Sequence, residues 1–224
     1  HHLRAGVGSG LILLDTHASM YFGTRQRFKS VQAARVAALA AWYATRAGER
    51  VGVLAFGGVD HLLRPQPGSR GALAVCGALA QWDASFRSDR QQPLSEALMR
   101  AAHLSNGPSR VLLDSDGFSC DLPARQRLLD LVRHAAVSVL VVGDPLELAL
   151  APPGRYPLEH AGECREVLLQ SARQRSDFRR ALGDGGVRLA ALAGALGLRS
   201  ATIDTTADPF DAVSGLIGRA GARR

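Results

Sequence analysis

Aromatic residues and lysine are scarce in this chain. Aromatics make up 5% of its 224 residues, and lysine occurs once, at position 29, although the formal net charge is +7. The basic residues are therefore nearly all arginine. They are scattered along the chain, apart from a modest cluster at Arg173, Arg175, Arg179 and Arg180. Because nucleic-acid binding usually needs a concentrated basic stripe and stacking aromatics, we expect no nucleic-acid partner.

Cysteine and long apolar runs are scarce as well. Cys76, Cys120 and Cys164 are odd in number and form no Cys-x-x-Cys pair, which argues against a zinc ribbon or a redox motif. Free thiols in a reducing compartment are the simplest interpretation, so we expect a cytoplasmic protein. No apolar run reaches the ~18 residues that a membrane-spanning helix needs, and we expect no membrane span in this chain.

The start of the chain carries little information about the fold. His1 and His2 resemble the remnant of a purification tag, and the first apolar run follows almost at once. We expect one domain over residues 3–224, long enough to bury a core without disulfides. We also expect it to be a fragment of a longer protein, and the sequence leaves open whether that protein has a membrane anchor.

Apolar, β-branched runs alternate with longer segments of helical composition. We expect strands at residues 7–15, 50–56, 59–64, 110–114, 136–143 and 198–204. We expect helices at residues 28–47, 71–81, 93–104, 123–134, 171–196 and 209–218, with the fifth interrupted by the glycines at 183–186. This alternation predicts an α/β fold, a three-layer, doubly wound and mainly parallel sheet. Residues 146–169 break the rhythm and predict an added β-hairpin.

Two of the predicted strands end on acidic residues. Asp15 follows one apolar run, and Asp114, Ser115 and Asp116 follow another. Binding sites in open parallel sheets lie beyond the carboxyl ends of the strands, so these carboxylates would meet if the strands are neighbours. Two carboxylates about 4 Å apart repel by roughly 4 kcal/mol at an effective dielectric of about 20. A divalent cation, a proton or a basic side chain must offset this repulsion.

The stretch Asp15-Thr-His-Ala-Ser19-Met, followed by Phe22-Gly23, resembles part of a von Willebrand factor A-type domain. It is more closely similar to the bacterial family called domain of unknown function 58. Further stretches that support the resemblance are residues 46–56, 93–98, 113–116, 144–147 and 204–209. They cover nearly the whole chain, and their order and spacing are together fairly specific.

This resemblance implies a metal-ion-dependent adhesion site. Asp15 and Ser19 match the first and third positions of its Asp-x-Ser-x-Ser loop, and Asp116 matches the acid that ends the central strand. His17 stands in place of the middle serine, and Gln92 stands in place of a threonine. We therefore predict a degenerate site in which Asp15, Ser19 and Asp116 hold Mg²⁺ or Mn²⁺ weakly or hold no metal. The residues expected to line it are His17, Gln92, Asp114 and Ser115.

Three interpretations of His17 stay open. It is a plain exposed loop histidine, or a nitrogen ligand that shifts the metal preference toward zinc, manganese or nickel. In the third interpretation, His17 is an imidazolium that neutralises Asp15 and Asp116 in place of the metal.

The resemblance implies a non-enzymatic protein-interaction module. Its partner would be a MoxR-type AAA+ ATPase or a client of that ATPase, in the assembly or maturation of other proteins. A metal-free scaffold of the same fold is the alternative. A third hypothesis is a phosphohydrolase, because Asp114-Ser-Asp116-Gly resembles the nucleophile motif of haloacid-dehalogenase-type phosphatases. Against it, that motif usually opens its fold, and no lysine lies downstream here.

Overall fold

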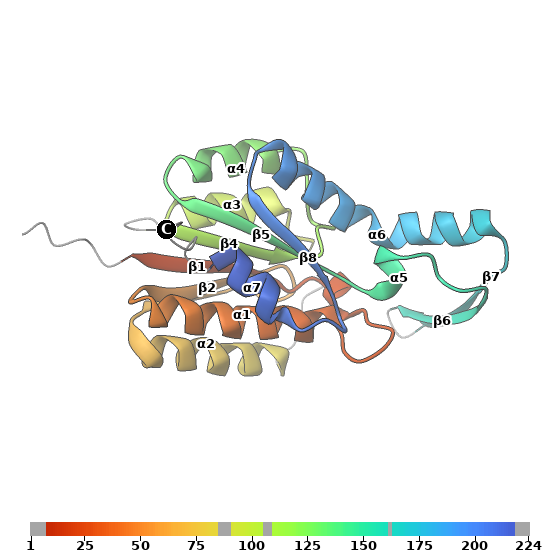
Figure 1. Ribbon diagram of the computed structural model, residues 1–224, viewed down its shortest axis with the longest axis horizontal. Coiled ribbons are helices and arrows are strands. Elements are labelled where there is room, and N and C mark those ends of the chain that lie inside the picture. The colour runs from red at the N-terminus through yellow and green to blue at the C-terminus, as the bar shows by residue number, and fades with distance from the viewer. Residues whose placement is uncertain (1–7, 85–90, 105–108, 161–162, 218–224) are drawn as a thin grey trace, which may run out of the picture.

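The computed structural model describes residues 8–84, 91–104, 109–160 and 163–217 (Figure 1). The predictions for His1 and His2 lie outside these residues, and the prediction of one domain over residues 3–224 stays a prediction. Among the described helices, none is long and apolar enough to cross a membrane.

A six-stranded sheet forms the middle layer of the protein. Its strands lie in the order β3 (His61–Gln66), β2 (Arg50–Phe56), β1 (Ser9–Asp15), β4 (Arg110–Ser115), β5 (Ala136–Gly143) and β8 (Arg199–Asp204). All neighbours are parallel except β2 and β3. Leu14 of β1 aligns with Ala55 on one side and with Asp114 on the other. The two strands that end on acids are therefore direct neighbours, as the strand-end prediction requires.

Helices cover both faces of this sheet (Figure 1). The first layer consists of α1 (Lys29–Arg46), α2 (Gly68–Asp83) and α7 (Pro209–Ile217), and the second of α3 (Leu94–Ala102), α4 (Ala124–Val132) and α6 (Ala172–Ala195). Ile12 and Leu14 of β1 face the first layer, and Leu11 and Leu13 face the second. Because side chains alternate along a strand, a central strand covered on both faces must be apolar throughout. The predicted three-layer α/β fold is confirmed.

The added hairpin is also confirmed, although its predicted range begins in a helix. The short helix α5 (Pro145–Leu148) comes first, and β6 (Gly154–His160) and β7 (Glu163–Leu169) then form a separate antiparallel pair. The β6–β7 hairpin and the first part of α6 project beyond the carboxyl ends of the parallel strands (Figure 1). A second short helix, η1 (Ala18–Tyr21), follows β1.

The predicted interruption of the fifth long helix is wrong. α6 runs unbroken through residues 183–186. Its glycines permit close packing instead, because a Cβ on Gly185 would lie 2.6 Å from the backbone nitrogen of Phe118. A Cβ on Gly183 would likewise lie 2.6 Å from the carbonyl oxygen of Glu147. Tertiary packing therefore outweighs the weak helix propensity of glycine, about 1 kcal/mol per residue.

Gly185→Ala should destabilise the protein by about 1–3 kcal/mol, because the added methyl group would lie 2.6 Å from the backbone nitrogen of Phe118. Gly194→Ala in the same helix is the matched control, since a Cβ there meets no described atom within 4 Å. That variant should gain about 0.5–1 kcal/mol from helix propensity. Urea denaturation measures both changes, and equal effects of the two substitutions would contradict this account of α6.

Candidate functional site

The carboxyl ends of β1 and β4 meet through a hydrogen bond. Ser115 Oγ donates to Asp15 Oδ2 at 2.6 Å. The other oxygen of Asp15 accepts a hydrogen bond from the backbone N–H of His17 at 3.0 Å and contacts His17 Nδ1 at 2.7 Å. Asp15 is buried, and both of its carboxylate oxygens are occupied by protein groups.

His17 is buried against the loop after β2. Its ring lies edge-on to Phe56 and covers Gly57, whose φ of +100° and lack of a Cβ leave room for the imidazole. Nε2 accepts a hydrogen bond from the backbone N–H of Gln92 at 3.2 Å, and Gln92 Oε1 accepts one from Gly57 N at 3.0 Å. The exposed-loop interpretation is therefore wrong. Both ring nitrogens of His17 already have protein partners, so in this arrangement neither is available as a metal ligand.

The protonation of His17 is coupled to Asp15. Burial lowers the pKa of His17. The hydrogen bond and the charge of Asp15, together with the charge of Asp116, raise it by more than burial lowers it, so the pKa lies above its ordinary value. The Gln92 amide fits the neutral ring, in which Nδ1 carries the hydrogen and Nε2 has a lone pair. Protonation exchanges this amide contact for a full charge beside Asp15. The geometry makes His17 the partner of Asp15 and fits the neutral ring, so the imidazolium of the third interpretation stays a prediction.

Asp116 is paired with a residue that the sequence analysis did not single out as a site residue. Lys29 is the first residue of α1, and its side chain is 1% exposed. Its Nζ lies 2.9 Å from Asp116 Oδ2 and 2.6 Å from Glu147 Oε1. The rings of Phe22 and Phe118 flank the same nitrogen, with centroids at 5.8 and 5.5 Å. Two carboxylates and two aromatic faces therefore surround one ammonium group.

This ion triad is strongly coupled. Burial lowers the pKa of Lys29, but the charges of Asp116 and Glu147 raise it by a larger amount. The pKa therefore lies above its ordinary value, and Lys29 is an ammonium at neutral pH. Burial raises the pKa of Glu147, and Lys29 lowers it only in part. A cation in the first turn of a helix also opposes the helix dipole. Both costs must be offset by the two carboxylates.

A third strand end carries an acid that sequence reasoning missed. Asp144 follows β5, is fully buried, and accepts hydrogen bonds from Thr24 N at 2.9 Å and Thr24 Oγ at 2.6 Å. It also accepts one from Thr205 Oγ at 3.1 Å and caps α5 by accepting from Leu146 N. Glu147 completes this cap by accepting from Asp144 N at 2.8 Å. The signal was available, because the strand-end rule that picked out Asp15 applies equally to Asp144.

Three predicted site residues, Ser19, Gln92 and Asp114, contain buried polar atoms without partners among the described residues. Ser19 Oγ and Gln92 Nε2 have no hydrogen-bond partner among the described residues. Ser19 lies on η1, directly after the Asp15 loop.

Asp114 takes no part in the hydrogen bonds described above, although the next residue of β4, Ser115, donates to Asp15. It is 0% exposed, and neither of its oxygens has a hydrogen-bond partner among the described residues. Burial, with a smaller contribution from the charge of Asp15, raises the pKa of Asp114 well above its usual range. A carboxyl group that is closed off from solvent is not reached by a substrate. The geometry therefore gives no support to the phosphohydrolase hypothesis.

The residues as arranged do not fit a divalent cation. Of the three predicted ligands, Asp15 and Asp116 have their carboxylate oxygens bonded to protein groups, and Ser19 alone keeps an unpartnered oxygen. A divalent ion about 4 Å from the Lys29 ammonium would be repelled by roughly 8 kcal/mol at an effective dielectric of about 20. Within the described part of the chain, no group of three or more His, Cys, Asp and Glu residues is placed to hold a metal ion.

A groove of about 720 Å³ opens beside these residues. One wall is the segment between η1 and α1, and the other is the start of the β6–β7 hairpin with the residues before it. Six of the side chains that line it are Tyr21, Phe22, Arg25, Phe28, Tyr156 and Leu158. Phe22 both lines this groove and flanks Lys29, so the groove and the ion triad share a wall.

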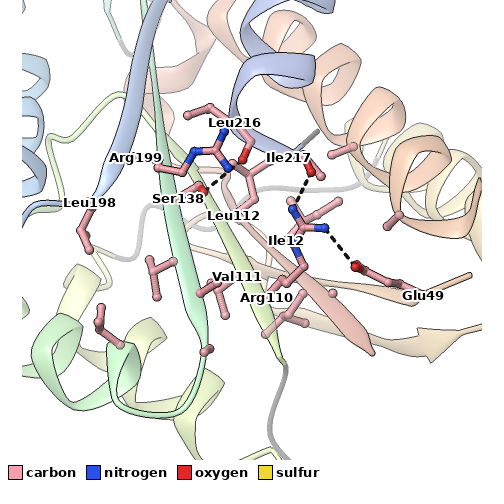
Figure 2. A pocket seen from close by; sticks show the side chains of 18 of the residues that line it. Ile12, Glu49, Arg110, Val111, Leu112, Ser138, Leu198, Arg199, Leu216 and Ile217 are labelled. Atoms are coloured by element: carbon pink, nitrogen blue, oxygen red, sulfur yellow. Dashed lines mark hydrogen bonds and ion pairs between the residues drawn. The ribbon is translucent and has the colours of Figure 1, made fainter. Parts of the chain in front are cut away.

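A separate cavity of about 520 Å³ lies at the opposite end of the sheet (Figure 2). Arg110 borders it and donates to Glu49 Oε1 at 3.0 Å and to the carbonyl oxygen of Ile217. Arg199 donates to the carbonyl oxygen of Gly215. Both guanidinium groups are thus engaged with the last turn of α7. None of the predicted site residues lines this cavity.

Comparison with known proteins agrees with this fold. The family model described as "Protein of unknown function DUF58" matches residues 9–187. The conserved hypothetical protein BatB from Bacteroides thetaiotaomicron is 16% identical, with a TM-score of 0.57 over 94% of this chain and 97% of that chain. An aerotolerance-related membrane protein from Bacteroides fragilis is 15% identical, with a TM-score of 0.57 over 94% and 98%.

A more distant structural relative is the manganese-loaded TRAP protein of Plasmodium vivax. It is 13% identical, with a TM-score of 0.53 over 93% of this chain and 71% of that chain. No curated protein matches the sequence. At these identities the structural likeness shows the fold alone, which is of the von Willebrand factor A type.

Lys29→Met should lower the free energy of unfolding by about 3–5 kcal/mol, because it leaves Asp116 and Glu147 buried without a counter-charge. Adding Glu147→Gln should recover part of this loss, since it removes one of the two unpaired charges. Arg173→Met is the control, because that side chain is exposed. Urea denaturation at pH 7 measures the series. A loss below about 1 kcal/mol for Lys29→Met would show that the triad is not a buried, coupled unit.

The raised pKa of His17 predicts a pH-dependent contribution to stability. The contribution of the imidazolium is full below the unfolded pKa of about 6.5 and is lost as the pH rises through the folded pKa. Wild type should therefore exceed His17→Gln in unfolding free energy by more at pH 5.5 than at pH 8.5. An NMR titration should give His17 a pKa above its ordinary value. A stability difference that grows with pH would contradict the assignment.

Proposed function

Because the chain belongs to the DUF58 family of proteins of unknown function, we propose that it is a protein-interaction module that binds a MoxR-type AAA+ ATPase or a client of that ATPase. The complex would act in the assembly or maturation of other proteins. The von Willebrand A-like fold supports an interaction role. The identity of the partner rests on the family resemblance.

The observation that carries the proposal is the aromatic groove beside the Asp15 loop. Phe28 is 49% exposed at the start of α1, and it lines this groove with Tyr21, Phe22 and Tyr156. Aromatic side chains dominate the binding energy of many protein interfaces, because they bury large areas at a low entropy cost. The groove lies beyond the carboxyl ends of the strands, where ligands of open α/β sheets bind.

The burial of the charges limits how a partner is recognised. Lys29, Asp116 and Glu147 are buried, so they do not meet the partner directly. The groove offers aromatic rings and the exposed side chain of Arg25 instead. A partner segment with an apolar side chain for the groove and a carboxylate for Arg25 fits this surface.

The proposal places the module in the cytoplasm, because an AAA+ ATPase needs ATP. The three cysteines are free, which agrees with a reducing compartment. The module itself has no catalytic step in this proposal.

Phe28→Asp and Tyr156→Asp should each weaken binding to a purified MoxR-type ATPase from the same organism by at least about tenfold, as expected for aromatic anchors at an interface. Leu73→Asp on α2 is the matched control, because Leu73 is 60% exposed but lies outside the groove. Surface plasmon resonance gives the dissociation constants. Circular dichroism checks that each variant folds.

Two results would count against the proposal. Absence of binding by the folded wild-type protein would reject this partner. Equal binding by the two groove variants and the control would place the interface elsewhere.

A further inference from the structure

Lys29 is the sole lysine of a chain whose other basic residues are arginine. Its ammonium nitrogen contacts one oxygen of Asp116 and one of Glu147, at 2.9 and 2.6 Å, and lies between two aromatic rings. Asp116 is also the acid that the family resemblance assigns to the metal. We infer that the Lys29 ammonium is a built-in cation of this adhesion site and excludes a divalent metal from it.

The chemistry of lysine fits this role better than that of arginine. An ammonium is a compact point charge with three donors, whereas a guanidinium is a larger planar fork. Two carboxylate oxygens and the faces of Phe22 and Phe118 all lie close to the single Lys29 nitrogen, as suits a compact cation. A lysine at the start of a helix, fully buried, is unfavourable on its own, so its position points to a specific charge requirement.

Asp15, the second carboxylate of the site, has protein partners of its own. Asp15 is held by His17 Nδ1 and by Ser115 Oγ, at 2.7 and 2.6 Å. Gln92 then fills the space next to His17 through its contacts with Nε2 and with Gly57. Each carboxylate that would face a metal therefore has its own partner from the chain. The exchange of ligands at positions 17 and 92 and the presence of Lys29 form one consistent set.

A lysine in place of a metal ion makes the charge of the site permanent. A metal site is switched by metal supply and by chelators, whereas a lysine is always present. The interaction surface should therefore be held in one state by the contacts between α1, β4 and α5. This consequence for partner binding rests on the proposed function, but the exclusion of the metal does not.

The test is a titration of the whole chain with Mn²⁺, followed by the loss of the electron paramagnetic resonance signal of free Mn²⁺. Calorimetry with Mg²⁺ runs in parallel. Wild type should bind neither ion at concentrations up to about 1 mM, the weak end of protein sites for divalent cations. Binding by wild type that disappears in Asp116→Asn would overturn the inference.

A gain-of-binding variant tests Lys29 itself. Lys29→Gln with Glu147→Gln removes the ammonium and one carboxylate, so the net charge is unchanged and Asp116 Oδ2 loses its charged partner. Adding His17→Ser places a serine hydroxyl in the middle position and removes the imidazole from Asp15 Oδ1. This triple variant should bind Mn²⁺ and show a higher unfolding temperature when the ion is present. Adding Asp116→Asn should abolish both effects.

The remaining outcomes also decide the question. A folded triple variant that binds no Mn²⁺ would show that Lys29 is not what excludes the metal, and would overturn the inference. Should the triple variant fail to fold alone, refolding that depends on Mn²⁺ supports the inference, and failure to refold with Mn²⁺ counts against it. Partner binding by wild type in excess EDTA is measured separately. Its absence with and without EDTA rejects the proposed function and leaves the titration result standing.

Discussion

The ion triad of Lys29, Asp116 and Glu147 constrains the whole carboxyl end of the sheet. Each of these charges alone would be too costly to bury, so α1, β4 and α5 must be placed to bring them together. Glu147 also caps α5, and Asp144 next to it binds Thr24 and Thr205. The same few contacts therefore position the segment that lines the aromatic groove. Loss of the ammonium would disturb both the fold and the surface.

Close packing around this triad explains residues that look unfavourable in isolation. The glycines of α6 let that helix approach Phe118, whose ring flanks the ammonium. Gly57 leaves room for the imidazole of His17, which in turn holds Asp15. At Gly185 the contact is gained in spite of the weak helix propensity of glycine, and at Gly57 it needs a backbone conformation that other residues rarely adopt. The site thus depends on small residues as much as on charged ones.

The fold was largely predictable from the sequence, because apolar strand segments alternate with helical segments and glycine or proline marks many of the boundaries. The sequence left open whether β1 and β4 are neighbours. The structure pairs them, and Asp15 and Ser115 meet there. Lys29 and Glu147 were missed because no local pattern shows that residues 118 positions apart will pair. The continuous α6 was missed because its glycines respond to packing, which the sequence alone does not display. Asp114 was placed at the site by position, yet its oxygens are buried without partners among the described residues.

The central claim is that a protein cation, and no metal ion, neutralises Asp116. Diffraction from crystals soaked in Mn²⁺, recorded at a wavelength where manganese scatters anomalously, tests this claim most directly. No anomalous peak is expected between Asp15 and Asp116, and the Lys29 nitrogen should remain in contact with Asp116 and Glu147. A peak at that position, with the Lys29 side chain displaced from Asp116, would contradict it.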